Sequence, residues 1–484
     1  MSVFNLKVHE EIARWRQEAK DEDNAKYFFP VPEVELLRSG ERSFLISRKG
    51  TGKTAIGQNI LKQKTADAFA TALSFKNFPF NDLYRSLRDN SFRQPNQYIS
   101  GWRFIIYCAI ARLMSANAAV DPGKRRFIKS LFASDLREAL PSTIGRWISG
   151  GFHFKFWEIG LGVKAARQFT DNQRSLAERA EVLKQFLLPS IGKSQYFVVF
   201  DELDEDYTSS ASTQEREEYF ALLTSLLKAV QLIREEFRES APGVRPIVLL
   251  RDDIFKQLSD SDRAKWTDNA VVISWDIDKI KNLLAFRLSR AAGVDPVMRF
   301  DEIWRDLVGR HETFTPNTKE WNKFDFIASY TLLRPRDFIY YVSDASRHVC
   351  EKIRVGVAHP GLSAEVLREC AREFAQHLKM ELEDEVGGQI PYIKDVMDMI
   401  LSFGERDFSF AEFQSAYAKG RSEARHTPWT LPAESVLNSL YLFSVIGFVR
   451  TSKEYYRYQN PTVDLDVGRT MLVHKGLFAA RKAN

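Results

Sequence analysis

The chain has 484 residues, of which 44% are hydrophobic and 27% are charged, and its formal net charge is +5. These proportions are ordinary for a globular protein, and the length predicts two or three domains. No apolar stretch approaches the length of a membrane span, the first residues do not form a signal peptide, and the 3 cysteines lie far apart without C-x-x-C spacing. Since no H-x-x-x-H pattern occurs either, we expect a cytoplasmic protein with no membrane partner, no disulfide and no zinc or other transition-metal site.

The N-terminal part predicts a lead-in followed by a strand, a loop and a helix. Residues 1–40 form a charged helix, the extended run Tyr27–Pro32 and a short helix from Glu33 to Leu37, and the apolar run Ser43–Ile46 then predicts a buried strand. Directly after it, residues 47–54 read SRKGTGKT, which matches the phosphate-binding pattern G-x-x-x-x-G-K-[ST] except at its first position. The alternative is a coincidental Gly/Lys loop.

Each part of this loop has a chemical role. Backbone N–H groups at the start of a helix point at an anion, the lysine reaches the β- and γ-phosphates, and the threonine hydroxyl holds Mg²⁺. Ser47 replaces the usual glycine and is tolerated if its φ stays negative. The predicted ligands are ATP and Mg²⁺, with adenine favoured because no N-K-x-D pattern occurs, and the predicted binding residues are Ser47, Lys49, Gly50, Thr51, Gly52, Lys53, Thr54 and Ala55. A lead-in such as Tyr27–Pro32 often packs beside the base.

The middle of the chain predicts a strand at Thr71–Phe75 and helices over residues 80–190. Within that stretch, His153–Lys164 partly alternates and predicts a hairpin, which either buries one face or stacks on nucleic acid. The run Tyr196–Phe200 then has the continuous apolar character of a central parallel strand. Asp201 and Glu202 follow it directly.

We expect Asp201 to bind Mg²⁺ through water and Glu202 to orient and deprotonate the attacking water. The acids at positions 204–206 are expected to cap a turn, and an acidic turn is also the alternative for the pair itself.

Two further strands follow, at Arg245–Leu250 and Val271–Trp275, with a long helix from Glu215 to Glu239 before them. Strands separated by helices predict a parallel α/β sheet, and ligands bind at the carboxyl ends of its strands. Arg251 stands at such an end, so it either senses the γ-phosphate or pairs with Asp201 or Asp252. A basic residue within Asp260–Trp266 is either structural or an arginine finger for a neighbouring subunit.

Residues 276–384 predict a helical lid, and a charged stretch at Met380–Gly388 ends it. Pro335 suits the first turn of a helix, which places Arg336 near that helix's start. Arg336, or Arg334, either contacts the γ-phosphate or forms an ion pair with Asp337.

The last hundred or so residues predict a winged helix. Helices are expected at Ile393–Phe403, from Phe408 and at Pro432–Phe443, followed by two wing strands at Gly447–Arg450 and Tyr455–Tyr458. Residues 419–484 hold 10 Lys/Arg against 5 Asp/Glu, a surplus that suits phosphate contacts. Because the third helix carries no Arg or Lys for base edges, we expect either non-specific DNA binding or protein docking.

Four short runs resemble a group of bacterial stand-alone P-loop ATPases related to the AAA+, STAND and KAP ATPases, often found in phage-defence loci. They are residues 47–56, Phe200–Asp204, Leu250–Phe255 and Arg334–Asp337. The resemblance extends over roughly residues 25–480, although Ser47 departs from the family's glycine. It implies Lys53 and Thr54 for phosphate and Mg²⁺, Asp201 and Glu202 for hydrolysis, and Arg251 and Arg336 as sensors.

The expected fold class is therefore α/β, with a parallel-sheet P-loop NTPase core of AAA+/STAND-like type. The core with its inserted helices and hairpin is expected over residues 1–275, the lid over 276–385 and the winged-helix-like domain over 386–484. The predicted function is an ATP-binding and ATP-hydrolysing switch, oligomeric, that couples nucleotide state to DNA or a partner protein in antiviral defence. The alternative is a nucleotide-gated scaffold with little turnover that recruits a separate effector protein.

Overall fold

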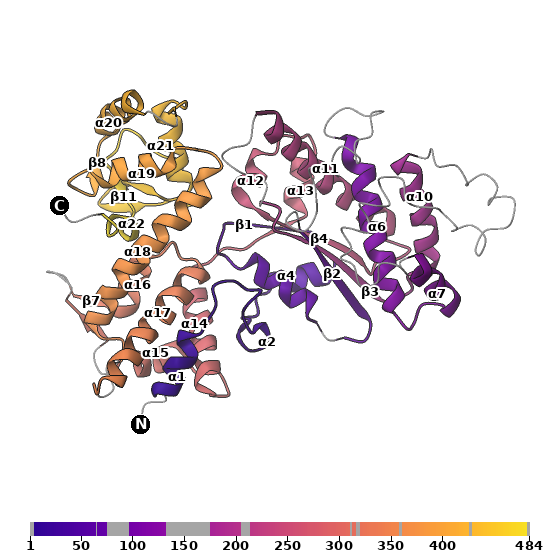
Figure 1. Ribbon diagram of the computed structural model, residues 1–484, viewed down its shortest axis with the longest axis horizontal. Helices are drawn as coiled ribbons and strands as arrows, with labels where there is room; N and C mark the ends of the chain where they lie inside the picture. Colours follow the sequence, from indigo (N-terminus) through magenta and orange to yellow (C-terminus); the bar gives the residue numbers. More distant parts are fainter. Residues whose placement is uncertain are drawn as a thin grey trace.

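The computed structural model describes residues 4–63, 65–74, 96–131, 175–204, 213–309, 312–315, 320–357, 361–424 and 428–481 (Figure 1). The hairpin expected at His153–Lys164 and the acids Glu205 and Asp206 lie outside these residues. The 3 cysteines are free, as their spacing predicts. Within the described residues, no helix is both long and apolar enough to span a bilayer.

A parallel sheet of 5 strands forms the core, as the alternation of strands and helices predicts. Its order is β2-β3-β4-β1-β5, and the strands are β1 (Phe44–Ser47), β2 (Ala68–Ser74), β3 (Gln195–Asp201), β4 (Val244–Arg251) and β5 (Ala270–Val272). In register, Ser47 is opposite Arg251, and Ser74 is opposite Asp201. These residues end their strands, so the loop and the acids meet at one edge of the sheet.

Helices cover both faces of this sheet (Figure 1). One face packs against α6 (Ile99–Ala116), α10 (Leu176–Leu187) and α11 (Thr213–Phe237), and the other against α3 (Glu33–Arg38) and α4 (Lys53–Leu61). Every residue of β3 from Tyr196 to Asp201 is buried, as a strand covered on both faces must be. The core region also contains α7 (Pro122–Leu131), α12 (Asp252–Gln257) and α13 (Arg263–Asp268).

The expected lid region is helical. It contains α14 (Ile277–Ala292), α15 (Phe300–Val308), α16 (Lys323–Tyr330), α17 (Pro335–Arg354) and α18 (Ala364–Gly387), with a small pair of strands, β6 (Thr313–Phe314) and β7 (Trp321–Asn322). The first helix of the chain, α1 (Leu6–Ala13), packs on α17 and α14 rather than on the sheet (Figure 1). His9 of α1 lies 3.4 Å from the Ser346 hydroxyl of α17, measured from Nδ1 to Oγ. The N-terminal end of the chain therefore shares a core with these helices.

The C-terminal region combines three main helices with an antiparallel sheet of 4 strands. The helices are α19 (Ile393–Leu401), α20 (Phe410–Glu423) and α21 (Ala433–Leu442), and the sheet order is β10-β9-β11-β8. Its strands are β8 (Asp407–Phe408), β9 (Ile446–Arg450), β10 (Lys453–Tyr455) and β11 (Met471–Val473). The second strand of the hairpin begins at Lys453, earlier than the sequence predicts, because Thr451 and Ser452 form a tight turn with φ of 51° and 59°.

This C-terminal region packs directly against the preceding helices. One hydrophobic core includes buried residues of α1, of α14 to α18 and of the C-terminal helices and strands. Lys475, at the start of α22 (Lys475–Phe478), lies over the rings of Trp321 and Tyr330 at 4.0 and 4.7 Å and donates to the Ser329 hydroxyl at 2.9 Å. The two regions are therefore packed as one body.

Candidate nucleotide-binding site

The loop after β1 has the backbone that its glycines suggest. Gly50 and Gly52 adopt φ of 79° and 101°, conformations that side chains with a Cβ rarely take. Ser47 is the last residue of β1, so extended backbone is available to it without glycine. Its hydroxyl lies 2.8 Å from the Thr51 hydroxyl, and both side chains are buried. The serine therefore closes the loop with a hydrogen bond that a glycine would not make.

Lys53 is the first residue of α4, directly after Gly52. Its ammonium group donates to the carbonyl oxygens of Ser47 and Arg48 at 3.0 and 2.9 Å. Burial lowers the pKa of Lys53, so an anion beside it would stabilise the charged form.

Thr54 and Asp201 face each other at the end of β3. The Thr54 hydroxyl lies 3.4 Å from Asp201 Oδ1, and the same oxygen accepts from the Glu202 backbone N–H at 2.9 Å. Burial raises the pKa of the Asp201 carboxyl, which a nearby cation would counter. A hydroxyl and a carboxylate at this distance fit the oxygen ligands that Mg²⁺ prefers.

Glu202 has φ of 54°, a conformation unusual for a side chain with a Cβ. Its carboxylate forms an ion pair with Lys20 at 2.6 Å. Two residues before that lysine, Glu18 forms an ion pair with Arg336 at 3.0 Å. We call residues 14–23 the N-terminal strap. Sequence reasoning missed it, because nothing in a charged lead-in indicates which charges it will meet.

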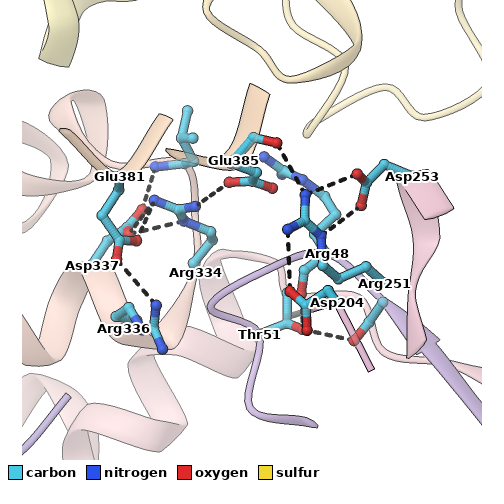
Figure 2. Close-up of polar contacts among 12 residues, drawn as sticks. Arg48, Thr51, Asp204, Arg251, Asp253, Arg334, Arg336, Asp337, Glu381 and Glu385 are labelled. Carbon is cyan, nitrogen blue, oxygen red and sulfur yellow. Dashed lines mark hydrogen bonds and ion pairs between the residues drawn. The ribbon is translucent and has the colours of Figure 1, made fainter. Parts of the chain in front are cut away.

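Arg251 is 7% exposed and pairs with two acids (Figure 2). Its guanidinium donates bidentately to Asp253 at 2.9 and 2.8 Å and to Asp204 at 3.2 Å. It also donates to the Glu385 carbonyl of α18 at 3.1 Å. Burial alone would lower the pKa of Arg251, but these acids raise it. We expected Arg251 to pair with Asp201 or Asp252, and it pairs instead with Asp253 and Asp204. The Asp253 carboxylate, two residues along the chain, accepts hydrogen bonds at both of its oxygens, which suits the two parallel donors of a guanidinium.

Arg336 and Arg334 come from the start of α17 and lie against the loop (Figure 2). The Arg336 backbone N–H donates to the Gly50 carbonyl at 3.4 Å, and its guanidinium pairs with Glu381 at 3.1 Å. The ion pair expected between Arg336 and Asp337 is made instead by Arg334, which is 1% exposed and donates to Asp337 at 2.9 Å.

All the predicted site residues except Ser47 line one cavity of about 350 Å³. Ser47, the last residue of β1, is buried and is not part of the lining. The strap, Arg336 and Glu381 also contribute to the walls. An apolar part is supplied by Phe28, Phe29, Val31, Ile56, Trp275 and Ile339. The cavity therefore combines apolar side chains with a glycine-containing loop and two acids.

Comparison with known proteins gives little beyond this geometry. No protein-family model matches the chain. A transposon gamma-delta 80.3 kDa protein of Escherichia coli (strain K12) is 23% identical over 335 residues, 64% of this chain and 43% of that protein. This chain thus spans less than half the length of that relative.

The crystal structure of Cdc6p from Pyrobaculum aerophilum aligns with 91% of this chain and 86% of its own, with 14% identity and a TM-score of 0.31. A score this low does not superpose the two chains as one fold. The parallel sheet and the loop geometry described above do not depend on this comparison.

Proposed function

We propose that the protein is an ATP-hydrolysing molecular switch. The observation that carries this proposal is that the phosphate-binding loop, the acid pair after β3 and a lid arginine line one cavity. ATP is the favoured nucleotide because the apolar walls suit a base and no guanine-binding motif occurs.

Each residue of the site has a role in this proposal. The amides of Gly50–Ala55 and the Lys53 ammonium hold the β- and γ-phosphates, and Thr54 and Asp201 hold Mg²⁺, which would neutralise phosphate charge. Glu202 accepts the proton of the attacking water. Arg336 would leave its acidic partners Glu381 and Glu18 to contact the γ-phosphate, whereas Arg251 stays paired with Asp204 and Asp253.

Contacts from the nucleotide cavity reach α17, α18 and the C-terminal region, so a change in bound nucleotide would be felt there. The Arg48 guanidinium in the loop lies 5.8 Å from the centre of the Tyr458 ring in the C-terminal region. Arg251 holds the Glu385 carbonyl of α18, and Gly50 accepts from the first turn of α17. A loop that moves on binding phosphate would shift the contacts of Arg48 and Gly50, and the lid and C-terminal region would follow together.

The proposal also covers the domains, the contact with DNA and the oligomer. Residues 1–275, 276–385 and 386–484 would act as core, lid and winged helix of an AAA+/STAND-like ATPase. The basic residues of 419–484 would contact DNA without sequence preference, and neighbouring subunits would complete the site in an oligomer. A role in defence against phage rests only on the family resemblance.

A nucleotide-gated scaffold with little turnover is the second candidate, and one observation favours it. Lys20 forms an ion pair with the Glu202 carboxylate, which is the group that would have to accept the proton. In that state Glu202 cannot also orient a water freely, so turnover would be slow until the strap moves.

Lys20→Ala is expected to raise basal ATP turnover by a few fold, because it frees Glu202 from a partly exposed ion pair worth about 1 kcal/mol or less. Steady-state phosphate release at saturating ATP measures it. Lys26→Ala is the matched control, since Lys26 pairs with Glu11 and does not line the cavity. A lower rate in Lys20→Ala would mean that the lysine helps catalysis instead of restraining it.

The test of the proposed function is ATP hydrolysis by the full chain with and without duplex DNA. Turnover that rises with DNA and is lost in Lys53→Ala is expected. ATP binding without turnover, lost in Lys53→Ala, would support the scaffold, and no ATP binding would reject both candidates.

A further inference from the structure

A second cluster of polar side chains lies between α17 and α18, away from the nucleotide cavity. Asp344 and His348 are one turn apart on α17, and Cys370 and Glu373 are one turn apart on α18. At 1.5 Å per residue, Asp344 lies about 12 Å along the helix from Arg336. None of these four residues lines the cavity.

The atoms that could bind a metal converge. One ligand atom each from Asp344, His348 and Cys370 lie within 4.8 Å of one another. His348 Nε2 is 3.9 Å from Asp344 Oδ2 and 3.4 Å from Glu373 Oε1. Three of these groups therefore lie within reach of one ion, and Glu373 lies beside His348.

The Asp344 carboxyl lies at the centre of this cluster. Its side chain is 3% exposed, its Oδ2 atom is 3.9 Å from His348 Nε2, and the carboxyl also interacts with the Cys370 thiol. The other Asp344 oxygen accepts from Arg347 at 2.6 Å. Two carboxyl groups, one of them buried, therefore lie beside an imidazole and a thiol. A cation among them would balance the charge of the two carboxylates.

The His348 ring lies among three acids. Its Nε2 atom faces Asp344 and Glu373, while Nδ1 lies 3.8 Å from Glu369 Oε2. Metal-bound histidines commonly donate their second ring N–H to a carboxylate, which fixes the tautomer and the ring orientation.

We propose that Asp344, His348, Cys370 and Glu373 form a structural zinc site that fastens α17 to α18. One nitrogen, one sulfur and two carboxylate oxygens suit tetrahedral Zn²⁺, whereas Mg²⁺ and Ca²⁺ prefer oxygen ligands alone. On binding, the Cys370 thiol loses its proton to solvent and its thiolate bonds to the metal. The expectation that the chain lacks zinc rested on C-x-x-C and H-x-x-x-H spacings, and this site uses neither.

The site would act on the nucleotide cavity through the helix pair. Arg334 lies directly before α17, and Glu385 lies in the last turn of α18. Their side chains pair at 3.2 Å beside the loop. A metal fixing the other half of the pair would hold these ends in register. This inference does not depend on the proposed ATPase activity.

The experiment uses the full chain, freed of metal by a chelator and then titrated with Zn²⁺ or Co²⁺ without nucleotide. One equivalent of bound zinc by elemental analysis is expected, and Co²⁺ should give a thiolate-to-cobalt charge-transfer band. Zinc should also raise the thermal midpoint, because a ligand that binds only the folded state stabilises it.

Variants assign the ligands. Cys370→Ser should abolish the cobalt band, and His348→Ala should lower zinc affinity by about 10-fold or more, since even losing an outer partner costs 10- to 100-fold. Cys350→Ser, on α17 but outside the cluster, and Asp201→Asn, in the nucleotide site, are matched controls that should keep full binding. Circular dichroism checks that each variant is folded.

Clear results would overturn the proposal. Less than one equivalent of zinc in the unaltered chain would do so. Binding unchanged in both folded ligand variants, or lost equally in Cys350→Ser, would place any zinc elsewhere.

Discussion

Glu202→Gln is expected to lower kcat for ATP hydrolysis by about 10²- to 10⁴-fold, the usual contribution of a general base, while ATP affinity stays largely unchanged. The amide cannot accept a proton from water. It can keep the same place, because the Glu202 backbone N–H donates to Asp201 Oδ1 at 2.9 Å in either variant. Steady-state phosphate release and equilibrium ATP binding measure the two effects separately.

Glu41→Gln is a matched control for this variant, since Glu41 is an exposed glutamate outside the cavity. It should hydrolyse ATP at the unaltered rate. If Glu202→Gln keeps its turnover while Lys53→Ala loses it, another acid must be the base, and Asp204, which also lines the cavity, would be examined next.

Arg334→Ala is expected to cost about 3–5 kcal/mol of unfolding free energy, because it leaves buried acids without their cation. Arg334 is 1% exposed and pairs with Asp337 and Glu385, whose side chains are 3% and 5% exposed. The side chain also packs against the loop, where its Cδ atom would lie 3.2 Å from a Cβ added at Gly50. Urea unfolding followed by fluorescence and circular dichroism gives the free energy.

Arg336→Ala is the comparison for stability. Its guanidinium pairs with Glu18, whose side chain is 64% exposed, and with Glu381, which is 14% exposed but also lies 3.7 Å from Arg334, so its loss should cost less than that of Arg334. Equal losses in the two variants would show that the buried network around Arg334 is not the stabilising element. A protein with Arg334→Ala that is as stable as the unaltered chain would contradict the argument directly.

The parts of the site that the sequence predicts are those fixed by local geometry. A strand, a glycine loop and a helix start within a dozen or so residues place Lys53 and Thr54, and an apolar run followed by two acids places Asp201 and Glu202. The parallel sheet that brings the two runs together also follows from a local alternation of strands and helices.

The charge partners could not be predicted in this way. Arg334 and Glu385 are 51 residues apart, and Arg336 and Glu18 are 318 apart. Several acids near each arginine in sequence are equally suitable by charge. The choice between Asp337 and its competitors depends on how α17 meets α18 and the loop, which no short pattern encodes.

The placement of α1 has a consequence for synthesis on the ribosome. His9 meets Ser346 across 337 residues, so the first helix lacks its main partner until α17 has emerged, although part of its contact with α14 can form earlier. At about 5–20 residues per second, that wait is roughly 20–70 s. The strands of the sheet emerge earlier and can pair in the meantime. The helix made first is therefore among the last to be buried, and its apolar face stays accessible to chaperones throughout that interval.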